Sequence, residues 1–244
     1  MAAVWLSHCA PVWAEEDSSP VPLIVRQRTG PDGEMLPMTA FNRELLGYFE
    51  RSLGARFDYR PYPWKRAAAL ALHGEGLLWG MPKDADETGT LVFSEPVYAT
   101  NIWMVARKAD KLKVDGLKDL KGKVLSAFRG CRYTGEFEAM RDKLFRVEED
   151  PDSFVIRLRK LHMGRVDVVL LHSRRATAEE VLKNLDVSLP EIDDLVILPK
   201  PMQREQIRFA ALRDSPHAKW IPKLNQIIAK GRKKGEIQKI VEDS

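Results

Sequence analysis

The chain has 244 residues, of which 44% are hydrophobic and 30% are charged, and its net charge is +4. That length allows one large domain or two small ones, each with its own core. Lysine and arginine are spread along the whole chain and mixed with acidic residues, whereas nucleic-acid-binding proteins more often gather them on one element. We therefore expect a soluble globular protein with a basic surface and no nucleic-acid partner.

The N-terminus has features of a secretion signal. Residues 1–14 carry no charge and end in Val12-Trp13-Ala14, directly before three acidic residues. Small residues at the −3 and −1 positions are typical of a signal-peptidase site. Because the apolar run is short and no basic segment precedes it, we interpret residues 1–14 as a truncated signal peptide; a cytosolic tail is the alternative. Cleavage would leave Cys131 as the only cysteine, in a protein that works outside the cytoplasm.

The first part of the chain alternates between strand and helix patterns. Leu45, Leu46, Phe49 and Leu53 share one side of an expected helix that Gly54 ends. The order strand-helix-strand-helix-strand implies a parallel sheet with covering helices. We predict strands at residues 23–26, 56–62 and 77–81 and helices at residues 41–53 and 64–73.

Residues 93–108 (FSEPVYATNIWMVARK) mark the exit from this first unit. Residues 101–106 form an apolar run of strand length, which indicates a buried strand. The following residues 109–122 are strongly polar. We therefore predict that the chain crosses here from one lobe into a second, with the ligand beside the crossing strand.

A second alternating series follows the crossing. We predict strands at residues 123–128, 145–147, 166–171 and 195–198, and helices at residues 134–144, 152–163 and 177–184. Residues 207–212 are apolar again and are the natural return crossing, and helices at residues 216–231 and 237–241 end the chain. This order predicts an α/β protein of two lobes: residues 20–104 with 206–244 form lobe 1, and residues 105–205 form lobe 2.

Four short motifs, taken in order, resemble family 3 of the bacterial extracellular solute-binding proteins. They are PWKR (63–66), FSEPVY (93–98), LKDLKGK (117–123) and GRVD (164–167), and the resemblance extends over about residues 20–241. Members of this family are periplasmic receptors that feed polar-amino-acid-type ABC importers. The resemblance implies a type II periplasmic-binding-protein fold, in which two α/β lobes joined by two crossing hinge strands close on a ligand. It also implies a periplasmic location and a membrane permease as partner.

Ligands of open α/β sheets bind beyond the carboxyl ends of the strands, so we expect the site between the two lobes. Closure of the lobes would exclude water and strengthen each polar contact. Our candidate ligand-binding residues are Trp64, Met81, Glu87, Ser94, Arg129, Gly130, Cys131, Arg132 and His172.

The segment RGCRY (129–133) lies between an expected strand and an expected helix. By resemblance, family members bind a ligand carboxylate here with backbone N–H groups, and an anion at a helix start is physically favourable. Arg129 and Arg132 would add charge-assisted donors; solvated loop arginines are the alternative. Cys131 would be a small lining residue, and Trp64 is either an aromatic wall of the cleft or a core residue that seats its helix.

Two positions depart from the family pattern. Amino-acid binders of the family carry an arginine shortly before FSxPxY, but residues 84–92 (DADETGTLV) contain three acids and no arginine. The same binders carry an aspartate five residues after the GRVD aspartate, where this chain has His172. We therefore expect a small polar or anionic solute other than a standard α-amino acid. His172 is either a cleft residue or structural, and we expect Asp167 to make a structural hydrogen bond or salt bridge.

The sequence shows no pattern of catalysis or cofactor binding. The five histidines do not pair at metal-ligand spacing, and neither a glycine-rich phosphate loop nor a serine nucleophile elbow occurs. We expect a monomer without metal, cofactor or catalytic residue that serves as a solute receptor for an importer. One alternative is a dehydratase-type enzyme on the same scaffold, with Glu87 or Glu95 in the cleft. The other is a sensory receptor that acts on a separate membrane partner.

Overall fold

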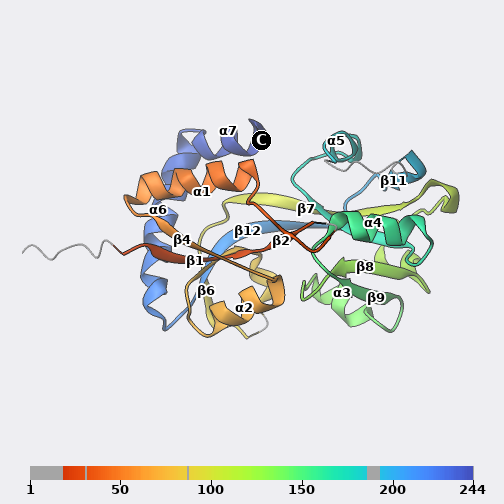
Figure 1. Ribbon diagram of the computed structural model, residues 1–244, viewed down its shortest axis with the longest axis horizontal. Helices are drawn as coiled ribbons and strands as arrows, with labels where there is room; N and C mark the ends of the chain where they lie inside the picture. Colours follow the sequence, from red (N-terminus) through yellow and green to blue (C-terminus); the bar gives the residue numbers. More distant parts are fainter. Residues whose placement is uncertain (1–18, 31, 87, 186–192, 244) are drawn as a thin grey trace, which may run out of the picture.

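A computed structural model describes residues 19–30, 32–86, 88–185 and 193–243. The predicted signal peptide at residues 1–14 and the candidate residue Glu87 lie outside these ranges. The chain forms two α/β lobes that lie side by side (Figure 1). None of the helices in the described ranges is long and apolar enough to span a membrane.

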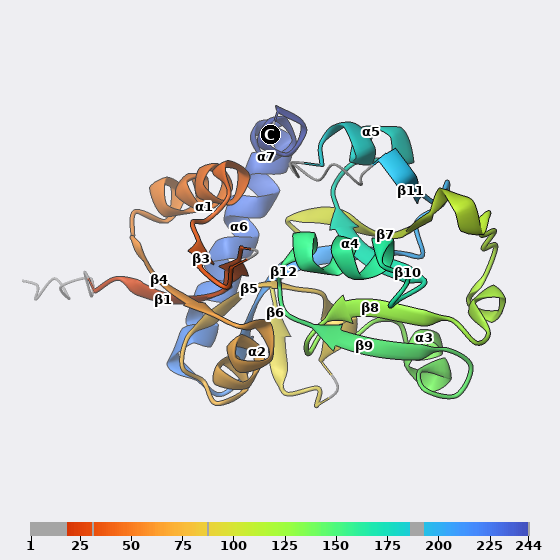
Figure 2. The same cartoon turned by 45° about the vertical axis from the view of Figure 1, so that its right-hand side comes forward.

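The first lobe contains the predicted parallel sheet. Its strands β1 (Val21–Arg26), β4 (Phe57–Tyr62) and β5 (Leu77–Met81) pair in the order β4-β1-β5, all parallel. Helices α1 (Ala40–Leu53), α6 (Trp220–Lys233) and α7 (Glu236–Asp243) cover one face, and α2 (Trp64–Leu72) covers the other (Figure 2). Helices cover both faces of the sheet, and consecutive strand residues point to opposite faces. Most residues of β1 and β5 are therefore buried, whereas those of the edge strand β4 are mostly half-buried.

Local signals in the sequence fix the limits of α1. The Thr39 side chain accepts a hydrogen bond from the Asn42 N–H at 3.2 Å, which caps the helix start. Gly54 ends the helix with a φ of 66°, a left-handed conformation that costs other residues energy. The buried side of the helix carries Phe41, Leu45, Leu46 and Phe49. The predicted amphipathic helix is therefore confirmed, and its ends are set by these two residues.

The second lobe repeats this plan with different residues. Strands β8 (Val124–Phe128), β9 (Arg146–Asp150) and β10 (Val168–Ser173) pair in parallel in the order β10-β8-β9. Helices α3 (Gly135–Met140), α4 (Phe154–His162) and α5 (Ala178–Lys183) surround this sheet. Helix α3 ends four residues earlier than we predicted, because Asp142 adopts a φ of 60° and its N–H bonds to the Phe145 carbonyl.

Two long strands connect the lobes. Strands β7 (Tyr98–Arg107) and β12 (Gln203–Leu212) pair antiparallel with each other, residues 98–102 opposite residues 203–207. β12 also pairs with β5 of the first lobe, and β7 pairs with β10 of the second. The two predicted crossing strands are thereby confirmed, and one sheet runs through both lobes. The lobe boundaries at residues 104/105 and 205/206 stay predictions.

Several short elements complete the fold. We did not predict the hairpin of β2 (Arg28–Thr29) and β3 (Met35–Leu36), nor β6 (Leu91–Phe93), which pairs with β12. β11 (Leu195–Ile197) was predicted and pairs antiparallel with the end of β7. Short 3₁₀ helices lie at Lys83–Ala85, Lys108–Asp110, Leu117–Leu120 and Pro216–Lys219.

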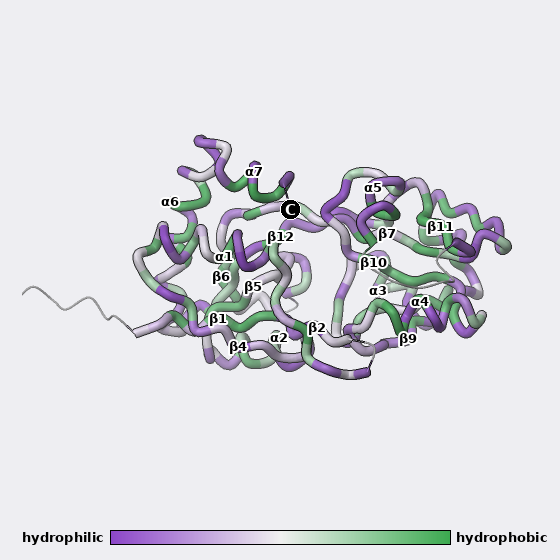
Figure 3. The backbone as a smooth tube through the Cα atoms, turned by 45° about the horizontal axis from the view of Figure 1, so that its top comes forward, coloured by the Kyte–Doolittle hydropathy of each residue, from purple (hydrophilic) through white to green (hydrophobic). Residues whose placement is uncertain are grey.

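Each lobe has its own hydrophobic core, and hydrophobic colour follows the central strands of both (Figure 3). In the first lobe the core centres on Phe209 of β12. Its ring centroid lies 4.5 Å from that of Trp79 and 5.0 Å from that of Phe49. Close aromatic contacts of this kind combine large buried area with favourable ring geometry.

Residues of the family-like motifs hold the fold together. Ser94 accepts a hydrogen bond from the Phe209 N–H at 3.0 Å, which fixes the FSEPVY loop to β12. Asp119 accepts bonds from the Asp115 and Gly116 N–H groups at the start of a 3₁₀ helix. Asp167 accepts from the Val124 N–H at 2.8 Å and lies 3.5 Å from the Arg107 guanidinium. The expected structural role of Asp167 is therefore confirmed.

We expect Phe209→Ala to destabilise the protein by about 3–5 kcal/mol, because it removes a fully buried ring and leaves a cavity at the core centre. Phe93→Ala is the matched control, since Phe93 pairs with β12 but is only partly buried. Urea unfolding measures both changes. A loss for Phe209→Ala no larger than that for Phe93→Ala would contradict this description of the core.

Candidate functional site

A pocket of about 800 Å³ lies between the lobes, beside the crossing strands. The first lobe contributes the end of β1, the β2–β3 hairpin, the start of α1, Trp64 and the end of β5. The crossing strands contribute Tyr98, Thr100, Glu205 and Ile207, and the second lobe contributes Cys131, Arg132 and His172. A volume of this size is typical of pockets for small molecules.

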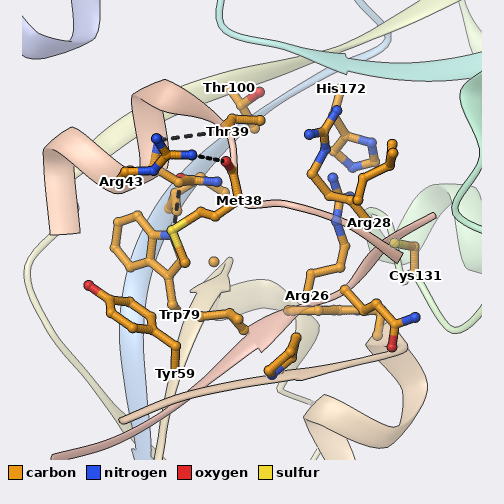
Figure 4. Close-up of a pocket in the computed structure, with 18 of the residues that line it drawn as sticks. Arg26, Arg28, Met38, Thr39, Arg43, Tyr59, Trp79, Thr100, Cys131 and His172 are labelled. Carbon is orange, nitrogen blue, oxygen red and sulfur yellow. Dashed lines mark hydrogen bonds between the residues drawn. The ribbon is translucent and has the colours of Figure 1, made fainter. Parts of the chain in front are cut away.

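One wall of the pocket is aromatic. Trp79 of β5 and Tyr98 of β7 lie with ring centroids 6.0 Å apart, and the Trp79 indole donates to Asn42 Oδ1 at 3.3 Å. Burial raises the pKa of the Tyr98 phenol to about 12, so this group stays neutral at physiological pH. Figure 4 shows Trp79 and Tyr59 on the opposite side of the pocket from Cys131. The wall therefore offers apolar contact with a few neutral polar groups.

Arginines supply the positive charge of the pocket. Arg28 donates to the Pro37 carbonyl at 3.1 Å, and Arg43 donates to the Met38 carbonyl at 3.2 Å. These carbonyls fix the two guanidinium groups without neutralising them, and no ion pair to either group occurs within the described ranges. Figure 4 shows Arg26 and Arg28 on the side of His172, and Arg43 near Trp79. The pocket can therefore bind an anionic group through charge-assisted hydrogen bonds.

A buried carboxyl group supplies the opposite charge. Glu205 on β12 is 6% exposed, and its Oε1 accepts a hydrogen bond from Gln203 Nε2 at 2.9 Å. Burial, reinforced by the negative charge of Asp84, raises the pKa of the Glu205 carboxyl to about 7. An ionised carboxylate in this position has lost hydration without gaining a compensating charge.

His172 lies close to Glu205 but does not form an ion pair with it. The distance from His172 Nε2 to Glu205 Oε2 is 3.8 Å. Burial and the positive charges of Arg26 and Arg157 lower the pKa of His172 to about 3. The imidazole is therefore neutral at physiological pH and stacks on Phe128, with ring centroids 5.4 Å apart. Its Nδ1 is buried and has no hydrogen-bond partner among the described residues.

Contacts between the lobes surround the pocket. Arg26 of β1 pairs with Asp152 of the second lobe at 3.0 Å, and the Thr29 N–H donates to the Asp152 carbonyl at 3.3 Å. Arg174 of the second lobe lies over the Phe41 ring, 3.4 Å from its centroid, and donates to the Val241 carbonyl. Both sets of contacts join the second lobe to the first.

Gly130 is another point of close approach. It has a φ of 78°, and a Cβ atom at this position would lie 2.8 Å from the Cβ of Lys65 in α2. Both the left-handed backbone and the proximity of the opposite lobe favour glycine. Trp64, which precedes Lys65, packs against the cores of both lobes. The start of α2 and the loop after β8 therefore meet directly.

The structure brings together some of the nine candidate residues from the sequence. Trp64, Cys131, Arg132 and His172 line the pocket, and whether they contact a ligand stays a prediction. Arg132 lies 3.7 Å from Glu138. Burial raises the pKa of the Cys131 thiol to about 12, which leaves it protonated and a poor nucleophile.

The other candidates lie away from the pocket lining. Met81 is 4% exposed and belongs to the core between α2 and the sheet. Ser94 is buried by its hydrogen bonds to β12 and to the Glu95 carbonyl. Arg129 and Gly130 precede the two lining residues Cys131 and Arg132 but do not line the pocket themselves. Glu87 lies outside the described residues.

The sequence contained signals for lining residues that we did not single out. Arg26 stands at the carboxyl end of the first parallel strand, where ligands of such sheets bind. Glu205 lies two residues before Ile207, the residue at which we began the return strand. If that strand is extended toward the N-terminus with a two-residue period, Glu205, Ile207 and Phe209 fall on the same buried face. The alternation was therefore sufficient to find Glu205.

No group of three or more histidine, cysteine, aspartate or glutamate residues in the described part of the chain is placed to hold a metal ion. Asp86, one of the three acids before FSEPVY, instead accepts bonds from the Thr88, Gly89 and Leu91 N–H groups. This carboxylate organises its own loop.

The searches for similar proteins gave a consistent result, although no family model matches the chain. The probable amino-acid-binding protein YxeM of Bacillus subtilis is 25% identical over 218 residues, which cover 84% of this chain and 75% of YxeM. The GluR0 ligand-binding core from Nostoc punctiforme, solved with L-glutamate, superposes with a TM-score of 0.70 at 16% identity, covering 92% of this chain and 98% of that one. This chain has the fold of the type II periplasmic binding proteins.

Two further solved structures share this periplasmic-binding-protein fold. AbpA from Streptococcus pneumoniae, an amino acid ABC transporter substrate-binding protein bound to L-arginine, superposes with a TM-score of 0.69 at 20% identity, over 92% of this chain and 93% of that one. A mutant of ArgBP from T. maritima superposes with the same TM-score at 22% identity, over 91% and 93%. The predicted fold class is thereby confirmed.

Glu205→Gln should remove a pH-dependent loss of stability. A carboxyl whose pKa is about 7 in the folded protein, against an ordinary value of 4.5, stabilises the folded state fully below 4.5 and loses this contribution as the pH rises through 7. We therefore expect the wild type to lose on the order of 1–3 kcal/mol relative to the variant between about pH 5 and pH 8. Urea unfolding across this range measures the difference. If the stability difference between wild type and variant does not change with pH, the description of Glu205 as a buried carboxyl without a counter-charge is wrong.

Proposed function

We propose that this protein captures a small polar or anionic solute by closing its two lobes and delivers it to the permease of an ABC importer. The observation that carries the proposal is the position of the pocket. Both lobes and both crossing strands line it, so a bound solute contacts every part that moves during closure. Such a solute stabilises the closed form through its additional contacts there.

The names of the relatives support a binding role. YxeM is described as a probable amino-acid-binding protein, and AbpA as a substrate-binding protein of an amino acid ABC transporter. From the same relationship we infer a periplasmic location and a permease partner, and we propose that the protein is a monomer. The arginines of the pocket, Arg28 and Arg43, supply donors for an anionic group of the solute.

We also propose that the solute is bound without being converted. Cys131 is held as a neutral thiol and His172 as a neutral imidazole without an orienting acid at hydrogen-bond distance. Glu95, a candidate for a dehydratase-type reaction, is exposed and lies outside the pocket lining, where its N–H bonds to Asn225. Cys131, His172 and Glu95 are therefore poorly placed to act as a general acid or base on the solute.

A ligand screen tests this function. We expect at least one member of a panel of amino acids, polyamines, organic acids and opines to raise the melting temperature of the protein in a saturable manner, because a ligand that binds only the folded state stabilises it. Product analysis by mass spectrometry, with prephenate in the panel, should find every compound unchanged. If any compound is converted, the protein is an enzyme and the proposed receptor function is wrong. If no compound stabilises the protein, the proposed receptor function is also contradicted.

Gly130→Ala should weaken solute binding by limiting closure. The new Cβ would meet Lys65 of the opposite lobe, whereas the matched control Gly122→Ala has a similar φ of 74° and no atom within 4 Å. Both variants should lose roughly 1 kcal/mol of stability from the left-handed backbone. Only Gly130→Ala should also lower the affinity for the solute found in the screen, by about tenfold if the contact costs 1.4 kcal/mol. Isothermal titration calorimetry measures the affinities. Equal affinities for the two variants would contradict the proposed role of Gly130 in lobe closure.

A further inference from the structure

Glu205 occupies an unusual position for a carboxylate. It is buried in the middle of the pairing between β12 and β7, directly opposite Thr100, and both residues line the pocket. Residues opposite each other in an antiparallel pair point to the same face. Figure 4 shows Thr100 and His172 along the same edge of the pocket. The Glu205 carboxyl is therefore at the base of the pocket, where the two lobes are joined.

No cation among the described residues compensates this carboxyl. Its hydrogen bond comes from the neutral Gln203 amide, and the nearby His172 is held neutral by burial and by Arg26 and Arg157. The charged group that acts on Glu205 is Asp84, which has the same sign. Burying an ionised carboxylate without a partner is unfavourable, so the folded protein carries a cost here that a bound cation would relieve.

The buried Arg157 of the second lobe has more hydrogen-bond partners than Glu205, although its Nη1 atom has none among the described residues. Arg157 is fully buried, and it donates to the Ser126 hydroxyl and to the carbonyls of Ser126 and Leu170. Its guanidinium also lies 4.1 Å from the centroid of the Phe128 ring. Glu205 has no comparable set of donors, although it faces a pocket that a solute can enter.

We propose that Glu205 forms an ammonium subsite, and that the natural solute carries a protonated amine as well as an anionic group. This inference rests on the proposed function and specifies its solute. The amine bonds to the Glu205 carboxylate, with the Thr100 hydroxyl opposite as a second acceptor. The anionic group lies toward one of two guanidinium groups, that of Arg28 on the side of His172 or that of Arg43 near Trp79. The pocket thus recognises the solute by two charges of opposite sign.

Pairs of probes that differ only in the amine test the subsite. We would use L-glutamate with glutarate, 5-aminopentanoate with pentanoate, and 1,4-diaminobutane with 1,4-butanediol. We expect the amine-bearing member of at least one pair to bind wild-type protein about tenfold more tightly or better, the factor that corresponds to 1.4 kcal/mol. Isothermal titration calorimetry and thermal shift measure the affinities on the full chain.

Variants assign the preference to the side chain. Glu205→Gln keeps the shape of the residue and an acceptor for Gln203, and we expect it to reduce the preference for the amine to less than about threefold. Glu205→Asp keeps the charge and should retain a measurable part of the preference. Glu136→Gln is the control for loss of an acidic residue, because Glu136 is exposed on α3 and outside the pocket, and it should behave like the wild type. Circular dichroism at each step shows that the variants are folded.

If amine probes bind, two results would overturn the subsite without affecting the receptor function. One is tighter binding of the amine-free partner, as expected if Glu205 is protonated and donates to a carboxylate. The other is an amine preference that Glu205→Gln leaves intact. If no amine probe binds while other solutes of the panel do, the subsite is also wrong, and the protein is still a solute receptor. If no solute of any class binds, both the ammonium subsite and the receptor function are wrong.

Discussion

The antiparallel pairing of β7 with β12 is the interaction on which the rest of the structure depends. Residues 98–102 and 203–207 are the part of the sheet that both lobes share, while the hydrophobic cores of the lobes are separate. The pairing therefore fixes the register in which the lobes are joined, and it places Thr100 and Glu205, which both line the pocket, at the junction.

The charges near this pairing fall into two groups. Some are matched within the protein, as in the Arg26–Asp152 pair between the lobes and in the Asp167 contacts to β8 and Arg107. Others, namely Glu205, Arg28 and Arg43, face the pocket and lack an opposite charge among the described residues. Of these three residues only Glu205 is buried, and an unmatched buried charge is unfavourable. Its position in the pocket lining is a physical sign of a binding site that does not depend on any named relative.

Periodicity in the sequence was a good guide to the fold and a poor one to the site. The strands and helices that we predicted from apolar spacing are present, because each buries a face of its lobe. The hairpin of β2 and β3 was too short to produce a pattern, and α3 ended early at the backbone turn of Asp142. The motif residues that carried the resemblance, such as Ser94, Asp119 and Asp167, act in the fold. The pocket is built instead from strand ends and from Glu205. The strand alternation indicates that Glu205 is buried, but its place in a pocket between the lobes depends on the three-dimensional fold.

The position of Phe209 also has a consequence for how the chain acquires its structure. Its ring completes the core of the first lobe, yet it lies far along the sequence from β1, β4 and β5. The strands and helices of the second lobe, from β8 to α5, are contiguous in the chain and need only local contacts among themselves. Contacts between distant segments form more slowly than local ones. The first lobe therefore cannot finish its core until nearly the whole polypeptide is available, and the nascent chain stays incompletely packed until β12 arrives.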